Sequence, residues 1–279
     1  MKKRIISAAV GILLTMTVLF FYRTSFYVFV ISGISVGIIY ELLVATKYSK
    51  NFPLSALSLI FAAMVPFFDV DPVSFEVKLV CFSFGALLFV VMLIFHNTVR
   101  LEQIGLVFFI SVFIPFSMST LLYVRERYTE NAMFYIVAVM VGAWTCDMGA
   151  YFVGTFFGKH KLAPKISPKK TVEGAIGGIA VSIISITLWC YAYIVYKSSK
   201  GVALEANLLY LFIIGFVAAV VGMLGDLFAS LIKRQCAIKD FGNIMPGHGG
   251  IFDRFDSIIF VAPVLYLLMQ YINPLSYKI

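Results

Sequence analysis

The chain has 279 residues, of which 61% are hydrophobic and only 13% are charged, and its formal net charge is +8. Soluble domains usually contain about 45–50% apolar residues, so this composition excludes an ordinary water-soluble globular protein. We expect membrane lipid around the chain and no nucleic acid as a partner.

The cysteines give no sign of a disulfide framework or a zinc site. They show neither paired nor C-x-x-C spacing, and three of the four lie in apolar runs. Cysteines in this setting are typical small buried hydrophobic residues. The four are Cys81, Cys146, Cys190 and Cys236.

Long apolar runs follow one another along the whole chain. Most reach the roughly 17–25 residues that a helix needs to cross a bilayer. The first run follows three basic residues and shows no convincing cleavage site, so we interpret it as a retained span. The weakest run is 53–68, which is short and contains Pro53 and Pro66. The runs cover residues 5–22, 26–45, 53–68, 77–95, 104–123, 132–157, 172–196, 207–232 and 256–272. We therefore predict an all-α polytopic membrane protein with about nine transmembrane helices.

The distribution of Lys and Arg predicts the orientation of these spans. With nine spans and a cytoplasmic N-terminus, fifteen Lys and Arg fall on the cytoplasmic side and seven on the other. The positive-inside rule favours this arrangement, which places the basic loops 158–171 and 233–255 in the cytoplasm. If the run 53–68 did not cross, the N-terminus would have to lie outside to keep these loops inside.

The two halves of the chain differ in chemical content. The first five apolar runs carry little chemistry, and we expect residues 1–130 to form a scaffold and a dimer surface. Glu41, near the cytoplasmic end of the second span, is interpreted as an interfacial carboxylate. Residues 131–279 carry most of the chemistry and are predicted to form a catalytic transmembrane core.

The sixth run places a carboxylate inside the membrane. Asp147 lies eleven residues before Gly158, or about 16 Å along a helix. Small residues at positions 150, 154 and 158 recur every four residues, which allows another helix to pack closely. Asp147 either lines a cavity open to the cytosol or only hydrogen-bonds a neighbouring helix.

The loop after the sixth run is strongly basic. It contains five Lys within twelve residues, which would attract anionic lipid headgroups at about 1 kcal/mol each near the surface. The stretch Ser167-Pro168-Lys169-Lys170-Thr171-x-Glu173-Gly174 is more ordered than membrane adhesion requires. We expect Ser167, Lys169 and Lys170 to bind an anionic substrate.

Charged residues also crowd between positions 225 and 256, which hold four of the fourteen acidic residues. On a helix, Asp226, Ser230 and Lys233 lie on one face. The following loop is rich in glycine, so its backbone can approach a bound group closely. Asp253 and Asp256 share a face at the start of the last apolar run. Two carboxylate clusters that flank a basic loop are typical of metal-assisted phosphoryl chemistry.

These residues also resemble a known signature. The pattern Ser230-x-x-Lys233-Arg234-x(4)-Lys239-Asp240-x-Gly242-x(3)-Pro246-x-His248-Gly249-Gly250-x-x-Asp253-Arg254-x-Asp256 is similar to that of the phosphatidate cytidylyltransferases, also called CDP-diacylglycerol synthases. The stretch from Asp147 to Gly154 and the basic loop resemble further motifs of that family. The resemblance covers about residues 143–256. It implies a homodimeric enzyme of the inner membrane that needs Mg²⁺.

The resemblance implies that CTP and phosphatidate are converted to CDP-diacylglycerol and diphosphate at a site that faces the cytoplasm. Asp226 and Asp253 would then hold Mg²⁺, together with a second cation. The candidate catalytic residues are Asp226, Ser230, Lys233, Arg234, Lys239, Asp240, His248, Asp253, Arg254 and Asp256. The candidate substrate-binding residues are Asp147, Ser167, Lys169, Lys170, Gly249 and Gly250.

Two other functions are compatible with parts of the pattern. An ion-coupled transporter would also bury Asp147 and Asp226, but it does not need a basic glycine-rich loop. A CTP-dependent lipid kinase uses the same nucleotide and releases CDP instead of diphosphate. The D-G-x-x-A-R pattern expected of a CDP-alcohol phosphotransferase is absent from the sequence.

Overall fold

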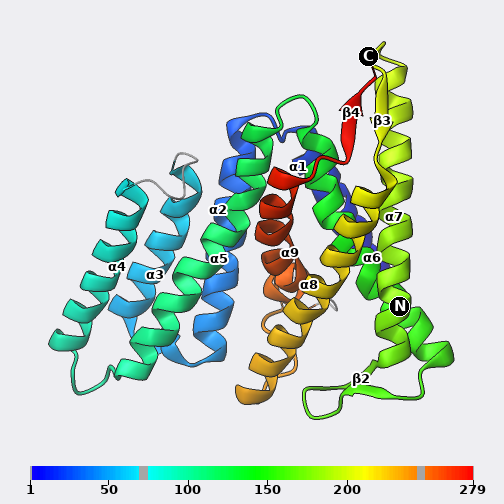
Figure 1. The fold of residues 1–279 in the computed structure, drawn as a ribbon. Helices are drawn as coiled ribbons and strands as arrows, with labels where there is room; N and C mark the ends of the chain where they lie inside the picture. Colours follow the sequence, from blue (N-terminus) through cyan, green and yellow to red (C-terminus); the bar gives the residue numbers. More distant parts are fainter. Residues whose placement is uncertain (1, 69–74, 244–248, 279) are drawn as a thin grey trace. The chain divides into compact units, whose positions relative to one another are not determined.

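The computed structural model describes residues 2–68, 75–243 and 249–278 (Figure 1). Within these ranges it contains nine α-helices, and the prediction of a helical membrane protein is confirmed. The helices are α1 (Lys2–Phe20), α2 (Ser25–Ala45), α3 (Phe52–Met64), α4 (Phe75–Ile94), α5 (Leu101–Arg127), α6 (Ala132–Phe157), α7 (Val172–Ser198), α8 (Leu208–Gln235) and α9 (Phe252–Tyr271).

Six of these helices are long and apolar enough to cross a membrane, judged within the described ranges. They are α2, the part of α4 from Glu76 to Ile94, α5, α6, α7 and α8. The apolar stretches Ala9–Phe20 and Phe52–Phe67 are shorter. The second of these is the weak run of the sequence, where α3 ends in a 3₁₀ turn, Val65–Phe67, that contains Pro66. The predicted count of nine spans therefore depends on α1, α3 and α9 in addition to the six.

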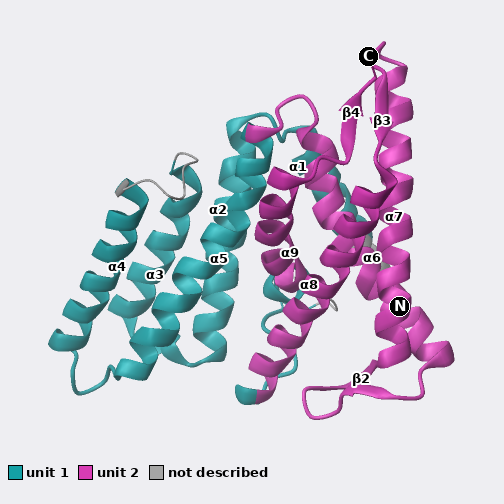
Figure 2. Cartoon of the chain, viewed as in Figure 1, with its two compact units in different colours: residues 1–126, 235–254 teal, residues 127–234, 255–279 magenta. Residues whose placement is uncertain are grey.

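The chain forms two compact units, which Figure 2 shows in separate colours. Unit 1 contains residues 1–126 and 235–254. The described parts of the glycine-rich loop, residues 235–243 and 249–254, therefore belong with the N-terminal helices, and we call them the signature loop. Unit 2 contains residues 127–234 and 255–279.

Aromatic side chains link the helices of unit 1. The ring of Phe61 on α3 stacks on that of Phe84 on α4, with centroids 4.1 Å apart. Phe84 in turn stacks on Phe108 of α5 at 6.0 Å. Phe61 and Phe84 are buried, whereas α4 leaves most of its other apolar residues exposed, as expected for a surface that faces lipid.

Glycines bring α6 and α7 of unit 2 into close contact. A Cβ atom on Gly178 of α7 would lie 3.1 Å from the Ala150 Cβ and 2.7 Å from the Cys146 carbonyl oxygen. A Cβ on Gly154 of α6 would lie 2.8 Å from the Thr171 hydroxyl. The prediction that the small residues of the sixth span admit a neighbouring helix is therefore confirmed, and that helix is α7.

Short strands replace two of the predicted loops. Strands β1 (Lys161–Ala163) and β2 (Ser167–Thr171) form an antiparallel hairpin in the basic loop. At its end the Thr171 hydroxyl accepts a hydrogen bond from Gly174 N, 3.1 Å away, and so caps α7. Strands β3 (Leu204–Ala206) and β4 (Leu275–Tyr277) pair near the C-terminus. The hairpin fixes the direction in which the predicted substrate-binding lysines point.

A contact between His160 and Glu173 holds the start of the hairpin against α7. His160 Nδ1 lies 2.6 Å from Glu173 Oε1, and Glu173 Oε2 also accepts hydrogen bonds from the backbone N–H groups of Lys159 and His160. The glutamate occupies the first turn of α7, where a carboxylate is favoured by the helix dipole.

Candidate active site

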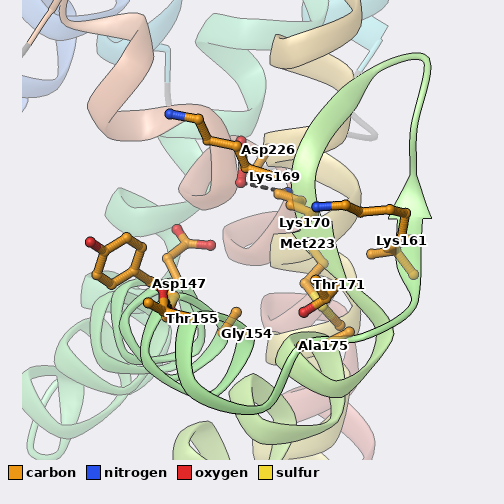
Figure 3. A pocket seen from close by; sticks show the side chains of 14 residues that line it. Asp147, Gly154, Thr155, Lys161, Lys169, Lys170, Thr171, Ala175, Met223 and Asp226 are labelled. Carbon is orange, nitrogen blue, oxygen red and sulfur yellow. Dashed lines mark hydrogen bonds and ion pairs between the residues drawn. The ribbon is translucent and has the colours of Figure 1, made fainter.

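The centre of the site in unit 2 is an ion pair between the hairpin and α8. Lys170 Nζ, near the end of β2, lies 2.5 Å from Asp226 Oδ2 (Figure 3). The side chains are 22% and 26% exposed, so the charges are only partly screened by solvent. The Ser230 hydroxyl, one helical turn after Asp226, lies 3.5 Å from Asp226 Oδ1. The predicted shared face of Asp226 and Ser230 is confirmed.

Glycine next to Asp226 lets α9 approach α8. A Cβ on Gly225 would clash with the carbonyl oxygen of Asp256 and lie 3.1 Å from the Ser257 Cα. This contact places the backbone of α9 at Asp256 and Ser257 beside the Gly-Asp pair of α8. Only glycine fits at position 225, which explains why it precedes Asp226.

Two more carboxylates meet at Ser257. The Ser257 hydroxyl lies 3.3 Å from Asp147 Oδ2 and 3.4 Å from Asp256 Oδ1. Asp256 is buried, with 8% of its surface exposed, and both Asp147 and Asp226 act on it electrostatically. Asp147 therefore belongs to a carboxylate cluster and also lines a cavity. Ser257 was not predicted from the sequence, because it is a small polar residue at the beginning of an apolar run.

The ion pair opens onto a cavity of about 430 Å³. Its charged lining residues are Asp147, Lys161, Lys169, Lys170 and Asp226. In Figure 3, Lys161 and Lys170 reach toward the same space from the hairpin. The cavity thus combines three ammonium groups with carboxylates on two helices, which suits a ligand that carries phosphate groups and a cation.

The basic end of α8 contacts the hairpin, and its predicted catalytic role stays a prediction. Arg234 Nε donates a hydrogen bond to the carbonyl oxygen of Ile166, 3.2 Å away, in the turn of the hairpin. Lys233 lies in the same last turn of α8, and its positive charge stabilises the ionised carboxylate of Asp256. Ser167 is half-buried at the start of β2. In this structure Arg234 holds the hairpin that carries Lys169 and Lys170.

In unit 1, Asp253 joins the two described parts of the signature loop, residues 235–243 and 249–254. Asp253 Oδ2 accepts hydrogen bonds from Phe241 N and from Gly250 N, each at 2.9 Å. Gly249 has a φ angle of +85°, and a Cβ there would lie 2.8 Å from the same oxygen. Two N–H donors therefore already engage Oδ2 of this predicted Mg²⁺ ligand.

A second carboxylate of unit 1 also binds the loop. Glu41 Oε1 and Oε2 accept hydrogen bonds from Ile251 N at 2.9 Å and Phe252 N at 2.8 Å. Glu41 is only 3% exposed, so its interpretation as an interfacial carboxylate was wrong. A glutamate in an apolar run 210 residues away carries no sequence signal for this contact.

Three predicted residues of the signature are exposed in unit 1, namely Lys239, Asp240 and Arg254. His248 lies outside the described residues. The predicted Mg²⁺ ligands Asp226 and Asp253 fall in different units, so their sharing of one ion stays a prediction.

Comparison with known proteins identifies the family. Residues 2–272 match the model of the cytidylyltransferase family. The chain belongs to this family. A phosphatidate cytidylyltransferase of Bacillus subtilis is 34% identical over 277 residues, covering 96% of this chain and 97% of the relative. The enzyme of the same name from Aquifex aeolicus is 40% identical over 58% of this chain and 57% of the relative. One from Rickettsia bellii is 39% identical over 62% and 71%.

As a cytidylyltransferase family member, the chain is a nucleotidyltransferase enzyme. Nucleotidyl transfer commonly uses Mg²⁺, which prefers oxygen ligands and is usually held by one or two carboxylates together with substrate phosphates. No three His, Cys, Asp or Glu residues form a metal-binding group in the parts of the chain that the structure describes. The carboxylate oxygens of Asp226 still fit an ion that takes most of its ligands from the substrate and water.

Proposed function

We propose that the protein is a phosphatidate cytidylyltransferase, which makes CDP-diacylglycerol from CTP and phosphatidate. A phosphate oxygen of phosphatidate attacks the α-phosphorus of CTP and forms a new P–O bond. The bond between the α-phosphorus and the bridging oxygen breaks, and diphosphate leaves. The observation that carries the proposal is the Lys170–Asp226 pair in a cationic cavity of a cytidylyltransferase family member.

Catalysis of this step consists mainly of neutralising charge and aligning the two substrates, because both carry several negative charges. Lys161, Lys169 and Lys170 line the cavity and would bind phosphate oxygens. Asp226 and Asp253 are the proposed ligands of Mg²⁺, which would supply Lewis-acid stabilisation of the phosphate oxygens.

The ion pair implies an exchange of partners during substrate binding. Asp226 Oδ2 is paired with the Lys170 ammonium in this structure. We propose that Lys170 transfers to a phosphate oxygen when the nucleotide enters, which leaves Asp226 to bind the cation. Charge at Asp226 stays balanced throughout, which matters because an unpaired carboxylate with little access to water is costly.

The location of the site also belongs to the proposal. CTP is a cytosolic, highly charged molecule, so the hairpin at 158–171 and the loop at 233–255 should both open to the cytoplasm. The excess of Lys and Arg in these two segments supports this orientation in the cytoplasmic (inner) membrane. A homodimer would use hydrophobic surface of unit 1, where α4 leaves most of its apolar residues exposed.

One assay tests the reaction. Purified protein in detergent is given phosphatidate, Mg²⁺ and CTP labelled at the α-phosphate, and label should enter the lipid fraction with equimolar release of diphosphate. Release of labelled CDP with no label in the lipid would indicate a CTP-dependent kinase instead. Absence of lipid label with every divalent cation would refute the proposal.

A further inference from the structure

The buried carboxylate of Glu41 is placed to control the geometry of the signature loop. Glu41 lies on α2, far from the catalytic signature in sequence, yet it accepts the backbone N–H groups of Ile251 and Phe252 at 2.9 and 2.8 Å. Phe252 is the first residue of α9, and Asp253 follows it directly. The first N–H groups of a helix have no partner inside the helix, and a carboxylate also favours the helix dipole.

Glycines pack closely around this carboxylate. A Cβ on Gly242 or on Gly250 would overlap the Glu41 carboxylate group. One turn earlier on α2, a Cβ on Gly37 would overlap the side chain of Ile251. A side chain at position 242 or 250 would therefore force the Glu41 carboxylate to move, and one at position 37 would displace Ile251.

Glu41 and Asp253 bind neighbouring backbone N–H groups at the start of α9. Asp253 holds the N–H groups of Phe241 and Gly250, whereas Glu41 holds those of Ile251 and Phe252. The rings of Phe241 and Phe252 pack between these contacts, 4.6 Å apart, and both are buried. Four backbone N–H groups thus depend on two carboxylates, and a shift of Glu41 must move the backbone that carries Asp253.

We infer that Glu41 is a positioning residue that aligns Asp253 for nucleotidyl transfer by anchoring the first turn of α9. The role of Asp253 in this inference rests on the proposed function. The hydrogen bonds from Ile251 and Phe252 to Glu41 are independent of that function. Glu41 contacts no reacting atom and acts through the backbone. Loss of a residue that orients a metal ligand typically lowers activity about 10–100-fold.

The test compares Glu41→Gln and Glu41→Asp with Glu102→Gln, which changes an exposed glutamate of unit 1. In Glu41→Gln the amide NH₂ group faces one of the two N–H donors, so one hydrogen bond is lost. We expect kcat to fall about 10–100-fold while KM for CTP and phosphatidate changes little. Glu41→Asp keeps the charge and should recover part of kcat, and Glu102→Gln should behave as wild type.

Hydrogen exchange provides a readout that does not depend on activity. In Glu41→Gln, peptides that contain Ile251 and Phe252 should exchange faster than in wild type, whereas peptides from α6 and α7 should not change. Unchanged kcat together with faster exchange would overturn the inference and leave Glu41 as a structural cap. Unchanged exchange would refute the contact itself. If wild type and Glu102→Gln are also inactive, the proposed function fails, and the exchange data still decide whether Glu41 anchors the loop.

A second variant tests the inference if Glu41→Gln does not fold. Gly242→Ala places a methyl group against the Glu41 carboxylate and leaves the glutamate in place. It should reproduce the loss of kcat and the faster exchange at Ile251 and Phe252. Wild-type turnover in Gly242→Ala would contradict the inference.

Discussion

The two units use their carboxylates in contrasting ways. In unit 1, Glu41 and Asp253 are bound to backbone N–H groups of one loop. In unit 2, Asp226 is bound to the side chains of Lys170 and Ser230, and Asp147 and Asp256 approach the hydroxyl of Ser257. Asp226 therefore holds side-chain groups that can rotate, unlike the two loop carboxylates of unit 1. Asp256 differs from Asp226 because it also accepts the backbone N–H of Ser257, 2.7 Å away.

The difference indicates which carboxylates can change partners. Releasing a backbone N–H in unit 1 would leave a buried donor unsatisfied, which costs about 1–3 kcal/mol for each group. The Lys170 side chain can leave Asp226 by rotating about its own bonds, and a phosphate oxygen can replace the carboxylate as its partner. We therefore expect unit 1 to supply a fixed geometry and unit 2 to supply the exchange of charge.

The largest expected effect comes from neutralising the proposed metal ligands. Asp226→Asn and Asp253→Asn each remove an anionic ligand at nearly constant volume, and each should lower kcat by about 10³-fold, since metal stabilisation of the transition state is worth several kcal/mol. Expression and folding should persist, because in Asp253→Asn the side-chain amide keeps a carbonyl oxygen that can accept the two loop N–H groups. The measurement is the Mg²⁺-dependent transfer of label into lipid by the purified variants.

A control variant and a contrary outcome complete this test. Glu102→Gln, which removes an exposed negative charge, should retain wild-type turnover. Wild-type Mg²⁺-dependent activity in Asp226→Asn or Asp253→Asn would remove that residue from the metal site. A lower melting temperature for Asp253→Ala than for Asp253→Asn would confirm that this carboxylate also has a structural role in unit 1.

A smaller effect separates two adjacent lysines of the hairpin. Lys170→Ala should raise KM for CTP about tenfold, since a charge-assisted hydrogen bond contributes about 1.5–3 kcal/mol. Lys169→Ala should raise KM about fivefold, as expected for one exposed charge near an anionic ligand. The change in kcat should be smaller for both variants. Lys165→Ala, in the exposed turn of the same hairpin, is the matched control.

The Mg²⁺ concentration needed for activity should also distinguish Lys170 from Lys169. If Lys170 occupies the cation position at Asp226, Lys170→Ala should lower the Mg²⁺ concentration that gives half-maximal activity, while Lys169→Ala should leave it unchanged. A large fall in kcat with constant KM would instead place Lys170 in the transition state. An unchanged Mg²⁺ requirement in Lys170→Ala would contradict the proposed exchange of partners.

Local patterns in the sequence predicted most of the fold, and the residues that they missed share a physical reason. Helix boundaries followed from long apolar runs, and α6 (Ala132–Phe157) has the predicted limits. The face shared by Asp226 and Ser230 followed from helical periodicity. The roles of Glu41 and Ser257 depend on contacts between distant segments, such as the 210 residues between Glu41 and Ile251. No spacing within a single run can report such contacts.

The conformation of the basic segment 158–171 was also not predicted from the sequence. Its five lysines predicted an anion-binding loop, but not a hairpin whose turn is held by Arg234. Strand pairing over three to five residues is too short to produce a clear alternating pattern, especially next to Pro164 and Pro168. The chemistry of the segment was therefore easier to predict than its conformation.

The smallest expected effect concerns access to the two loops. If hairpin and signature loop serve one cytosolic nucleotide, Ser167→Cys and Asn243→Cys, each in a variant without the native cysteines, should resist a membrane-impermeant thiol reagent while the cell membrane is intact. Both should react after the membrane is opened. Ser199→Cys, in the segment that follows α7, should react with intact cells. Labelling of Ser167→Cys or Asn243→Cys from outside would refute the proposed orientation and with it the route for CTP.

Protection of the introduced cysteines by bound nucleotide then distinguishes unit 1, which contains residue 243, from unit 2, which contains residue 167. CTP with Mg²⁺ should slow labelling of Asn243→Cys several-fold, because the exposed residue 243 lies in the signature loop that would cover the phosphates. The same addition should slow Ser167→Cys less, since Ser167 is already half-buried at the start of β2. The Glu41→Gln substitution should weaken protection at residue 243, because the loop that Glu41 anchors would then be less well ordered around the nucleotide. Equal protection with and without Glu41→Gln would show that nucleotide contact with this loop does not depend on the anchor on α2.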